Sequence, residues 1–479
     1  MQQLLERVNG FIWGVPALIL ILGVGLYLTF GSGFAQIKLL PYAIRHFFGS
    51  MKRGASGEGS SFQSLCTALA ATVGTGNIAG VAGAIAIGGP GSIFWMWVCA
   101  VLGMITKFAE AALSVRYRKK QDGCFLGGPM YMIEEGIGRK WRPMAVIYCL
   151  FGVIAAFGVG NATQINAVID SVNAAMSSFG RTNTLTGNLI MGGILASMTA
   201  VCLLGGGKRI GQVAMYLIPF ASAAYILLSL GAIAHNAHRI PAAFAAILRG
   251  AFCPSAVTGG TLGSAVIALR IGASRGVFTN EAGMGTAGIA HGAADVKSPC
   301  QQGLMGIMEV FLDTLVICTM TAMVILTSGT PVHYGLDEGV LLTAQAFACT
   351  YGSGIHIPMA AFLSCFAFGT MLGWGLYGLR CAQYLFGKRA EKAFVAVQCA
   401  ASLASVLLGT GTVWILAETV NGLMAIPNLL ALAILSPEFF KIARKYQKEE
   451  RPEALFKNQL SPSSNNAAKG TDTMVPSDS

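Results

Sequence analysis

The chain has 479 residues, of which 54% are hydrophobic and only 11% are charged, and its mean hydropathy is +0.63. This composition excludes a soluble globular protein and predicts that most of the chain lies in a lipid bilayer. The net charge of +11 does not indicate nucleic-acid binding, because the basic residues gather in loops on one side of the predicted topology.

The hydropathy pattern predicts an all-α polytopic membrane protein with about eleven transmembrane helices. The predicted spans are residues 11–30, 64–88, 91–114, 144–171, 188–204, 211–233, 256–290, 304–327, 356–379, 393–410 and 412–436. The seventh is too long for one straight helix, so we expect it to be broken or partly re-entrant. The first is long for a signal peptide and lacks a strongly basic leader, so we interpret it as a retained span.

Loop charges predict the orientation of these spans. With the N-terminus outside, the inward loops and the C-terminal tail contain 25 of the 32 Lys and Arg residues, whereas the outward segments contain four. We therefore expect a cytoplasmic C-terminus. The tail, residues 437–479, is expected to be largely disordered, because its last twenty or so residues are polar and rich in Ser and Asn.

The second span contains an irregular stretch, T-V-G-T-G-N-I-A-G-V-A-G, at residues 72–83. Irregular backbone survives in hydrocarbon only where it lines a cavity or a ligand site. In a helix broken near its midpoint, the N–H groups of the second half attract a carboxylate and the carbonyls of the first half attract a cation. Tight packing through glycine is the alternative, but residues 74–77 cover every face of one turn. The stretch therefore favours co-transport of an amino acid with an ion.

Polar side chains in the fourth and ninth spans are expected to face the same site. Asn161 and Gln164 lie three residues apart on one helix face, and Gln164 either contacts substrate or bonds to another helix. The Thr370 hydroxyl suits sodium, although threonines within helices also bond to their own i−4 carbonyl. Trp374, one turn later, either fills the core or forms the wall of a small pocket.

A second irregular segment, residues 268–287, contains four glycines together with Arg270, Arg275 and Glu281. Charges at membrane depth usually face a partner or a water-filled path, so these belong either to a gate or to an ion pair that fixes a bend. When the first span is left out, the two irregular segments fall in helices one and six of the remaining ten. Because five is odd, the two halves start from opposite sides of the membrane, as in an inverted repeat.

Other buried charges are less specific. Lys107 and Glu110 form an i,i+3 pair near the inner end of the third span, and Glu309, Asp313 and Glu418 are acids that could carry protons. The twelve cysteines and six histidines show no metal-ligand or catalytic spacing. The sequence therefore does not predict an enzyme.

Four motifs resemble the family of alanine or glycine:cation symporters, also called sodium:alanine symporters. They are V-G-T-G-N-I-A-G-V-A-G-A-I-A-I-G-G-P-G-S-I-F-W-M-W-V at 73–98, F-L-G-G-P-M-Y-M-I at 125–133, G-V-F-T-N-E-A-G-M-G at 276–285 and N-G-L-M-A-I-P-N at 421–428. The first contains G-G-P-G-x-x-F-W-M-W, on which the family signature centres. The similarity extends over nearly the whole chain.

This resemblance implies a LeuT-type fold, with a five-plus-five inverted repeat and broken helices. Residues 1–63 would then hold an extra helix and a cytoplasmic loop, residues 64–233 the first repeat and residues 234–436 the second. It also implies a multi-pass symporter of a prokaryotic plasma membrane that imports a small neutral amino acid with Na⁺ or, in some members, H⁺. Its expected partners are the amino acid, sodium and membrane lipid. Alanine, glycine, serine and glutamine all stay open as substrates, and an uncoupled facilitator or channel is the alternative from another class.

The first break is also similar to A-V-G-L-G-N-F in the sodium-coupled leucine transporter. That similarity implies that backbone N–H groups at the break hold the substrate carboxylate and that carbonyls before it hold sodium. The expected substrate-binding residues are Thr75, Gly76, Asn77, Gln164, Ile271, Gly272 and Trp374. The expected sodium ligands are Ala70, Val73, Ala367 and Thr370, with Thr72 and Asn77 as candidates for a second ion.

Overall fold

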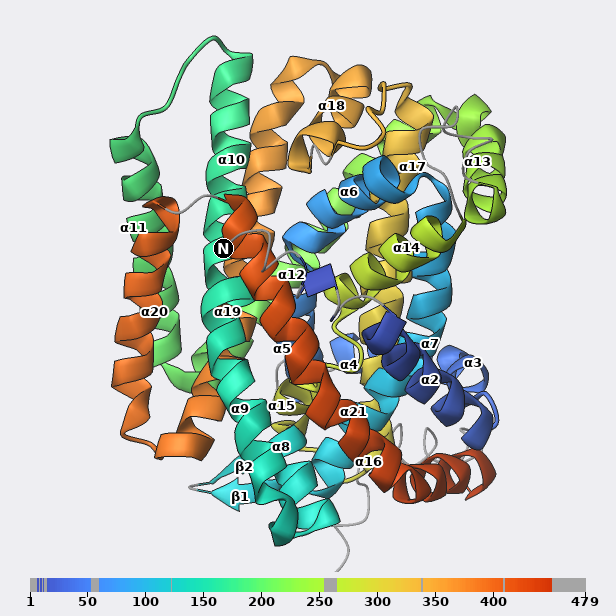
Figure 1. Ribbon diagram of the computed structural model, residues 1–479, viewed down its shortest axis with the longest axis vertical. Coiled ribbons are helices and arrows are strands. Elements are labelled where there is room, and N and C mark those ends of the chain that lie inside the picture. The colour runs from blue at the N-terminus through green and yellow to red at the C-terminus, as the bar shows by residue number, and fades with distance from the viewer. Residues whose placement is uncertain are drawn as a thin grey trace, which may run out of the picture.

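The computed structural model describes residues 15–52, 60–121, 123–253, 265–336, 339–407 and 410–449, with positions 7, 9, 10 and 12 before them. Apart from one short hairpin, the regular elements of these residues are helices (Figure 1). Eight of the described helices are long and apolar enough to cross a membrane. The expected all-α membrane fold is therefore confirmed. The count of eleven stays a prediction, because α2 has 17 residues and the separate halves of the two interrupted helices are shorter still.

The elements follow one another in the order expected from the hydropathy pattern. The first half of the chain contains α2 (Val15–Gly31), α3 (Ala35–Lys38), α4 (Leu40–Lys52), α5 (Ser61–Thr72), η1 (Thr75–Asn77), α6 (Ala79–Gly88), α7 (Gly91–Arg116), β1 (Lys119–Gln121), β2 (Cys124–Leu126), α8 (Pro129–Tyr131), η2 (Met132–Ile137), η3 (Arg139–Trp141), α9 (Arg142–Phe157), η4 (Gly158–Ala162), α10 (Thr163–Ser178), α11 (Leu185–Leu204) and α12 (Gly206–His235). The second half contains η5 (Ala237–Arg239), α13 (Ile240–Phe252), α14 (Ala265–Asn280), α15 (Thr286–Gly292), α16 (Pro299–Val310), η7 (Phe311–Cys318), α17 (Thr319–Ser328), α18 (Val340–Tyr351), η8 (Ser353–Ile355), α19 (His356–Phe386), α20 (Ala390–Leu407) and α21 (Thr410–Glu449). Strands β1 and β2 pair antiparallel, with Lys119 opposite Leu126.

Two helices are interrupted, as the irregular segments predict. The first consists of α5, η1 and α6, and it leaves the helical conformation at Gly74, whose backbone is extended. The second consists of α14 and α15, separated by residues 281–285. Gly283 and Gly285 take positive φ angles of 94° and 80° there, which glycine adopts without steric cost.

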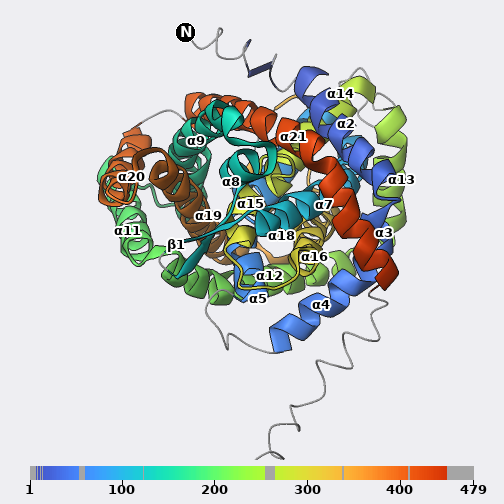
Figure 2. The ribbon, with the colours of Figure 1, turned by 90° about the horizontal axis from the view of Figure 1, so that it is seen from below.

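Small residues let the helices around the interrupted pair approach closely. A Cβ atom at Gly272 would meet the Ser92 carbonyl, so α14 lies directly on α7. A Cβ atom at Gly306 would lie 2.7 Å from the Lys107 carbonyl, so α16 lies on the same helix. Helices α11 and α20 lie side by side at one edge of the molecule in both ribbon views (Figure 2). Close approach through small residues is the usual packing mode of membrane helices.

Two features differ from the sequence-based prediction. Helices α13 and α18 lie in predicted outward loops, and α4 lies in a predicted inward loop. The last helix continues through Pro427 and Pro437 to Glu449, so the tail begins with helix; residues 450–479 lie outside the described part of the chain. The hairpin and α8 lie at the lower end of Figure 1, whereas α13 and α18 lie at the upper end. Cys253 and Cys349, in segments predicted to face outward, are free cysteines.

Candidate functional site

A small buried cavity lies where the two interrupted helices, the η4–α10 segment and α19 meet. Its volume is about 10 Å³, which is room for about one water molecule. The lining residues are Ala71, Thr72, Gly74, Thr75, Gly76, Val159, Gln164, Phe278, Thr279, Glu281, Thr370 and Trp374. The cavity therefore contains backbone from the first break and a carboxylate from the second.

The side chain of Asn77 fixes the first break. Its Oδ1 accepts a hydrogen bond of 2.8 Å from the Gly74 amide, which would otherwise bond to the Ala70 carbonyl within a continuous helix. Its Nδ2 donates to Asp313 Oδ1 at 2.7 Å. Asn77 thus faces Asp313 and is not among the cavity residues, which corrects its expected place in the substrate pocket. Thr75 and Gly76 begin the following turn, where backbone amides have no intrahelical acceptor.

Thr370 lies directly against the first break. A Cβ atom at Gly74 would be 2.5 Å from Thr370 Oγ1. That hydroxyl is buried and has no hydrogen-bond partner among the described residues, so it does not make the i−4 bond that threonine often makes in helices. Thr72 does make this bond, with its Oγ1 donating to the Ala68 carbonyl at 3.3 Å. Of the two threonines, only Thr370 presents a hydroxyl without a protein partner.

Three of the expected sodium ligands, Ala70, Val73 and Ala367, would contribute only their backbone carbonyl oxygens. Ala70 and Val73 lie in and just after the last turn of α5, whose final carbonyls have no intrahelical donor. A Cβ atom at Gly369 would be 3.5 Å from the Ala70 oxygen, so α19 runs alongside these carbonyls, and Ala367 on α19 is fully buried. Carbonyl and hydroxyl oxygens of this kind suit a hard cation.

Gln164 and Trp374 line the cavity, as one of the two interpretations of each residue predicts. Gln164 Nε2 donates to the Val159 carbonyl at 3.0 Å, while its Oε1 has no partner among the described residues. Trp374 is fully buried, and its Nε1 donates to Glu281 Oε1 at 2.6 Å. Asn161 instead bonds between helices, because its Nδ2 donates to the Gln398 carbonyl at 2.9 Å.

The second break lies ten residues beyond its expected place. The prediction that Ile271 and Gly272 line the pocket is wrong, because α14 runs unbroken through both residues and Gly272 packs against α7. Phe278, Thr279 and Glu281 line the cavity instead. The two glycines of the N-E-A-G-M-G stretch at 280–285 were the signal for this position.

Glu110 on α7 holds the second break in place. Its Oε1 accepts hydrogen bonds from the amides of Gly283 and Gly285, at 2.9 and 3.0 Å, and from Asn428 Nδ2 at 2.8 Å. Lys107 does not pair with Glu110, as its spacing suggested, but with Glu309 at 2.7 Å. The role of Glu110 could not be read from the sequence, because its partners are far away along the chain.

Hydrogen bonds also connect the two breaks. Asp313 accepts from Asn77 at the first break and, through its Oδ2, from the Thr314 hydroxyl at 2.8 Å. Thr314 Oγ1 in turn accepts from Asn280 Nδ2 at 3.2 Å, next to the second break. Asp313 is therefore a junction between the two interrupted helices.

The remaining intramembrane charges form separate pairs. Arg275 Nη1 lies 3.0 Å from Glu418 Oε1, so Arg275 forms an ion pair, whereas Glu281 accepts a hydrogen bond from Trp374. Glu309 Oε2 also lies 3.0 Å from His291 Nε2. The other ring nitrogen, His291 Nδ1, lies 2.7 Å from Gln302 Nε2.

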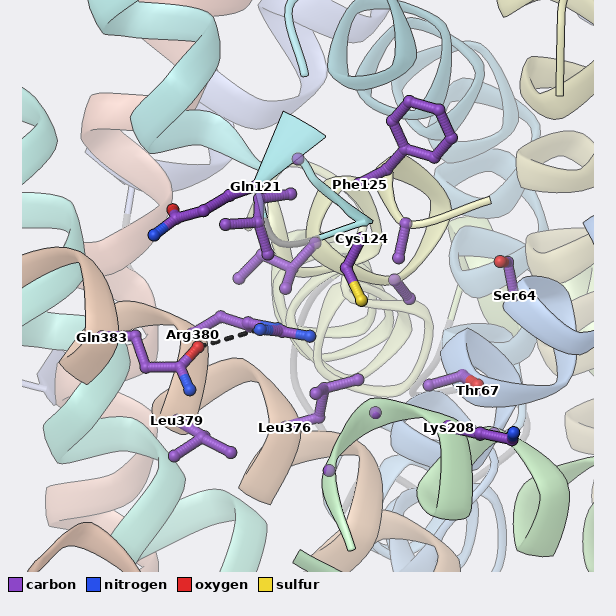
Figure 3. Close-up of a pocket in the computed structure, with 18 of the residues that line it drawn as sticks. Ser64, Thr67, Gln121, Cys124, Phe125, Lys208, Leu376, Leu379, Arg380 and Gln383 are labelled. Atoms are coloured by element: carbon purple, nitrogen blue, oxygen red, sulfur yellow. Dashed lines mark hydrogen bonds between the residues drawn. The ribbon is translucent and has the colours of Figure 1, made fainter. Parts of the chain in front are cut away.

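A larger cavity of about 540 Å³ opens at the end of the molecule that carries the hairpin (Figure 3). It is lined by segments predicted to face the cytoplasm, including Cys124, Lys208 and Arg380, and by α5, α15 and α19. Thr67 on α5 lines it one helical turn from Ala71, which lines the small cavity. We call this larger space the vestibule.

Comparisons of sequence and structure relate this chain to known proteins. A sequence model of the sodium:alanine symporter family matches residues 1–459. The sodium/alanine symporter AgcS of Methanococcus maripaludis is 43% identical over 462 residues, which cover 94% of this chain and 98% of the relative. A probable sodium/glutamine symporter, GlnT of Bacillus subtilis, is 34% identical over 464 residues, covering 94% and 92% of the two chains. The solved structure of MhsT in complex with L-phenylalanine superposes with a TM-score of 0.57 at 14% identity, covering 81% of this chain and 99% of that one; this likeness shows a LeuT-type fold.

Proposed function

Because the chain belongs to the sodium:alanine symporter family, we propose that it imports alanine or glycine across a prokaryotic plasma membrane, driven by the sodium gradient. The observation that carries this proposal is the small cavity, where amides at a helix break lie beside unpartnered side-chain oxygens. In this proposal the amides of Thr75 and Gly76 hold the substrate carboxylate. The Thr370 hydroxyl and the carbonyls of Ala70, Val73 and Ala367 hold the co-transported sodium ion.

Alternating access would be carried by two five-helix halves, residues 64–233 and 234–436. The basic loops support an orientation with the C-terminus in the cytoplasm, and the vestibule lies at the end where these loops gather. In the conformation described, the vestibule reaches to within one turn of α5 from the cavity. We interpret it as the release path toward the cytoplasm.

Uptake into liposomes tests the function. Purified protein under an inward sodium gradient should accumulate labelled alanine, and potassium in place of sodium should abolish accumulation. Equal uptake with and without a cation gradient would identify an uncoupled facilitator instead. Uptake driven by a proton gradient alone would identify proton coupling.

Glutamine is a second candidate substrate, since one relative is named a probable sodium/glutamine symporter. The fully buried indole of Trp374 in the cavity wall favours the smaller amino acids. Competition of labelled alanine uptake by alanine, glycine, serine and glutamine, each chiral one as both enantiomers, would rank them. Glutamine competing best would replace alanine in the proposal.

The substrate carboxylate is expected to be essential for binding. Backbone donors at a helix break recognise an anion, and the neutral amide of alaninamide cannot replace it. Alaninamide should therefore fail to compete at concentrations where alanine competes fully. Effective competition by alaninamide would show that residues 74–77 are not the carboxylate site.

A further inference from the structure

Glu281 is an unusual residue in the small cavity. It follows α14 at the start of the second break, it is only 2% exposed, and it lines the cavity. Its φ angle is +54°, in the left-handed region that residues other than glycine, asparagine and aspartate rarely adopt. Backbone strain of this kind persists where the surrounding structure holds it, often at ligand sites.

Among the described residues, the direct hydrogen-bond partners of the Glu281 carboxylate do not include a cation. Its Oε1 accepts from Trp374 Nε1, and its Oε2 accepts from the Thr286 hydroxyl at 2.7 Å. Both donors are neutral. Lys107, the cation whose charge acts on Glu281, forms its salt bridge with Glu309 instead. A buried carboxylate without a countercharge is costly, and a carboxylate has about four acceptor positions, of which two are used.

The same cavity contains groups that favour an anion and a group that favours a cation. The amides of Thr75 and Gly76 belong to the first break and favour an anion, whereas Glu281 belongs to the second break and favours a cation. A zwitterionic amino acid carries both groups on one carbon atom. We propose that Glu281 is the countercharge for the α-ammonium group of the substrate. This inference rests on the proposed function and names the residue that recognises the second charged group.

A charge-neutral substitution separates recognition from structure. Glu281→Gln keeps an oxygen acceptor for Trp374 and nearly the same volume, but it removes the negative charge. L-lactate has the shape of alanine with a hydroxyl in place of the ammonium group. Glu281→Gln removes the proposed anion from the protein, and L-lactate removes the cation from the ligand, so combining them tests the ion pair between the two groups.

The experiment compares alanine and L-lactate as competitors of labelled alanine binding to the purified full-length protein in sodium. For the wild type we expect alanine to compete at least 100-fold better than lactate. Glu281→Gln should reduce this ratio by 10- to 100-fold, mainly because alanine binds more weakly while lactate is little changed. Glu438→Gln, an acid outside the cavity that contacts Arg116, is the matched control and should keep the wild-type ratio.

An unchanged alanine-to-lactate ratio in folded Glu281→Gln would overturn the inference. This holds even if the variant changes the pH dependence of uptake. If Glu281→Gln does not fold, Glu281→Asp takes its place. The aspartate keeps the negative charge, so this variant should keep the preference for alanine over lactate. Loss of that preference would overturn the inference. The proposed function fails separately, if the wild type takes up neither alanine nor glycine. In that case the preferred amino acid from the competitor panel, with its hydroxy analogue, replaces the alanine–lactate pair, and binding of no amino acid would end both proposals.

Discussion

Replacing Trp374 with alanine is expected to widen the substrate range toward leucine and methionine and to weaken alanine uptake. The indole is fully buried and forms part of the cavity wall. An additional methylene forced into a packed space costs about 1–3 kcal/mol. At about 1.4 kcal/mol per tenfold, removing the wall should improve the larger competitors relative to alanine by roughly 5- to 150-fold.

Trp374 also donates to Glu281, so the volume effect must be separated from the lost hydrogen bond. Trp374→Phe loses the same donor but keeps most of the ring, and it should widen the range much less than Trp374→Ala. Trp141→Ala removes a half-exposed indole at the hairpin end and should leave the ranking of competitors unchanged. If Trp374→Ala reaches the membrane and ranks competitors as the wild type does, Trp374 does not set the pocket size.

Replacing Thr370 with valine is expected to raise the sodium concentration for half-maximal uptake tenfold or more. Valine keeps the shape of the side chain and removes the unpartnered hydroxyl beside Gly74. Tenfold corresponds to about 1.4 kcal/mol, the least we expect for a lost ion ligand. Thr370→Ser keeps the hydroxyl and should keep most of the sodium dependence. Uptake of labelled alanine over a sodium titration measures both.

Thr327→Val provides the control for Thr370→Val. Thr327 is also buried in a helix, but its hydroxyl donates to its own i−4 carbonyl, Met323, at 2.7 Å and lies outside the cavity. This variant should keep the wild-type sodium requirement. A sodium requirement in Thr370→Val equal to that of Thr327→Val would exclude Thr370 as an ion ligand.

The position of the first break could be predicted from the sequence, whereas the second break lies ten residues beyond its predicted position. At residues 74–77 the polar and glycine residues cover a whole helical turn, so no continuous helix could use them for one-sided packing. In the second segment, glycine has two uses that look alike in sequence. Gly272 lets α14 pack on α7, while Gly283 and Gly285 supply the positive φ angles of the break.

Contacts between distant helices set the limit of the remaining predictions. Thr72 and Thr370 are both threonines within apolar spans, yet one bonds to its own helix and the other does not. Lys107 could be paired with Glu110 by spacing, but the fold brings Glu309 closer and leaves Glu110 to the amides of the second break. Local periodicity contains no information about such partners.

The small volume of the cavity has a consequence for measured affinity. About 10 Å³ is room for about one water molecule, so an amino acid can bind here only after the cavity widens. Where the wider conformer is only a fraction of the population, the apparent dissociation constant equals the intrinsic one divided by that fraction. A substitution remote from the cavity that shifts this equilibrium would change the affinity for all substrates by one common factor and leave their ranking intact.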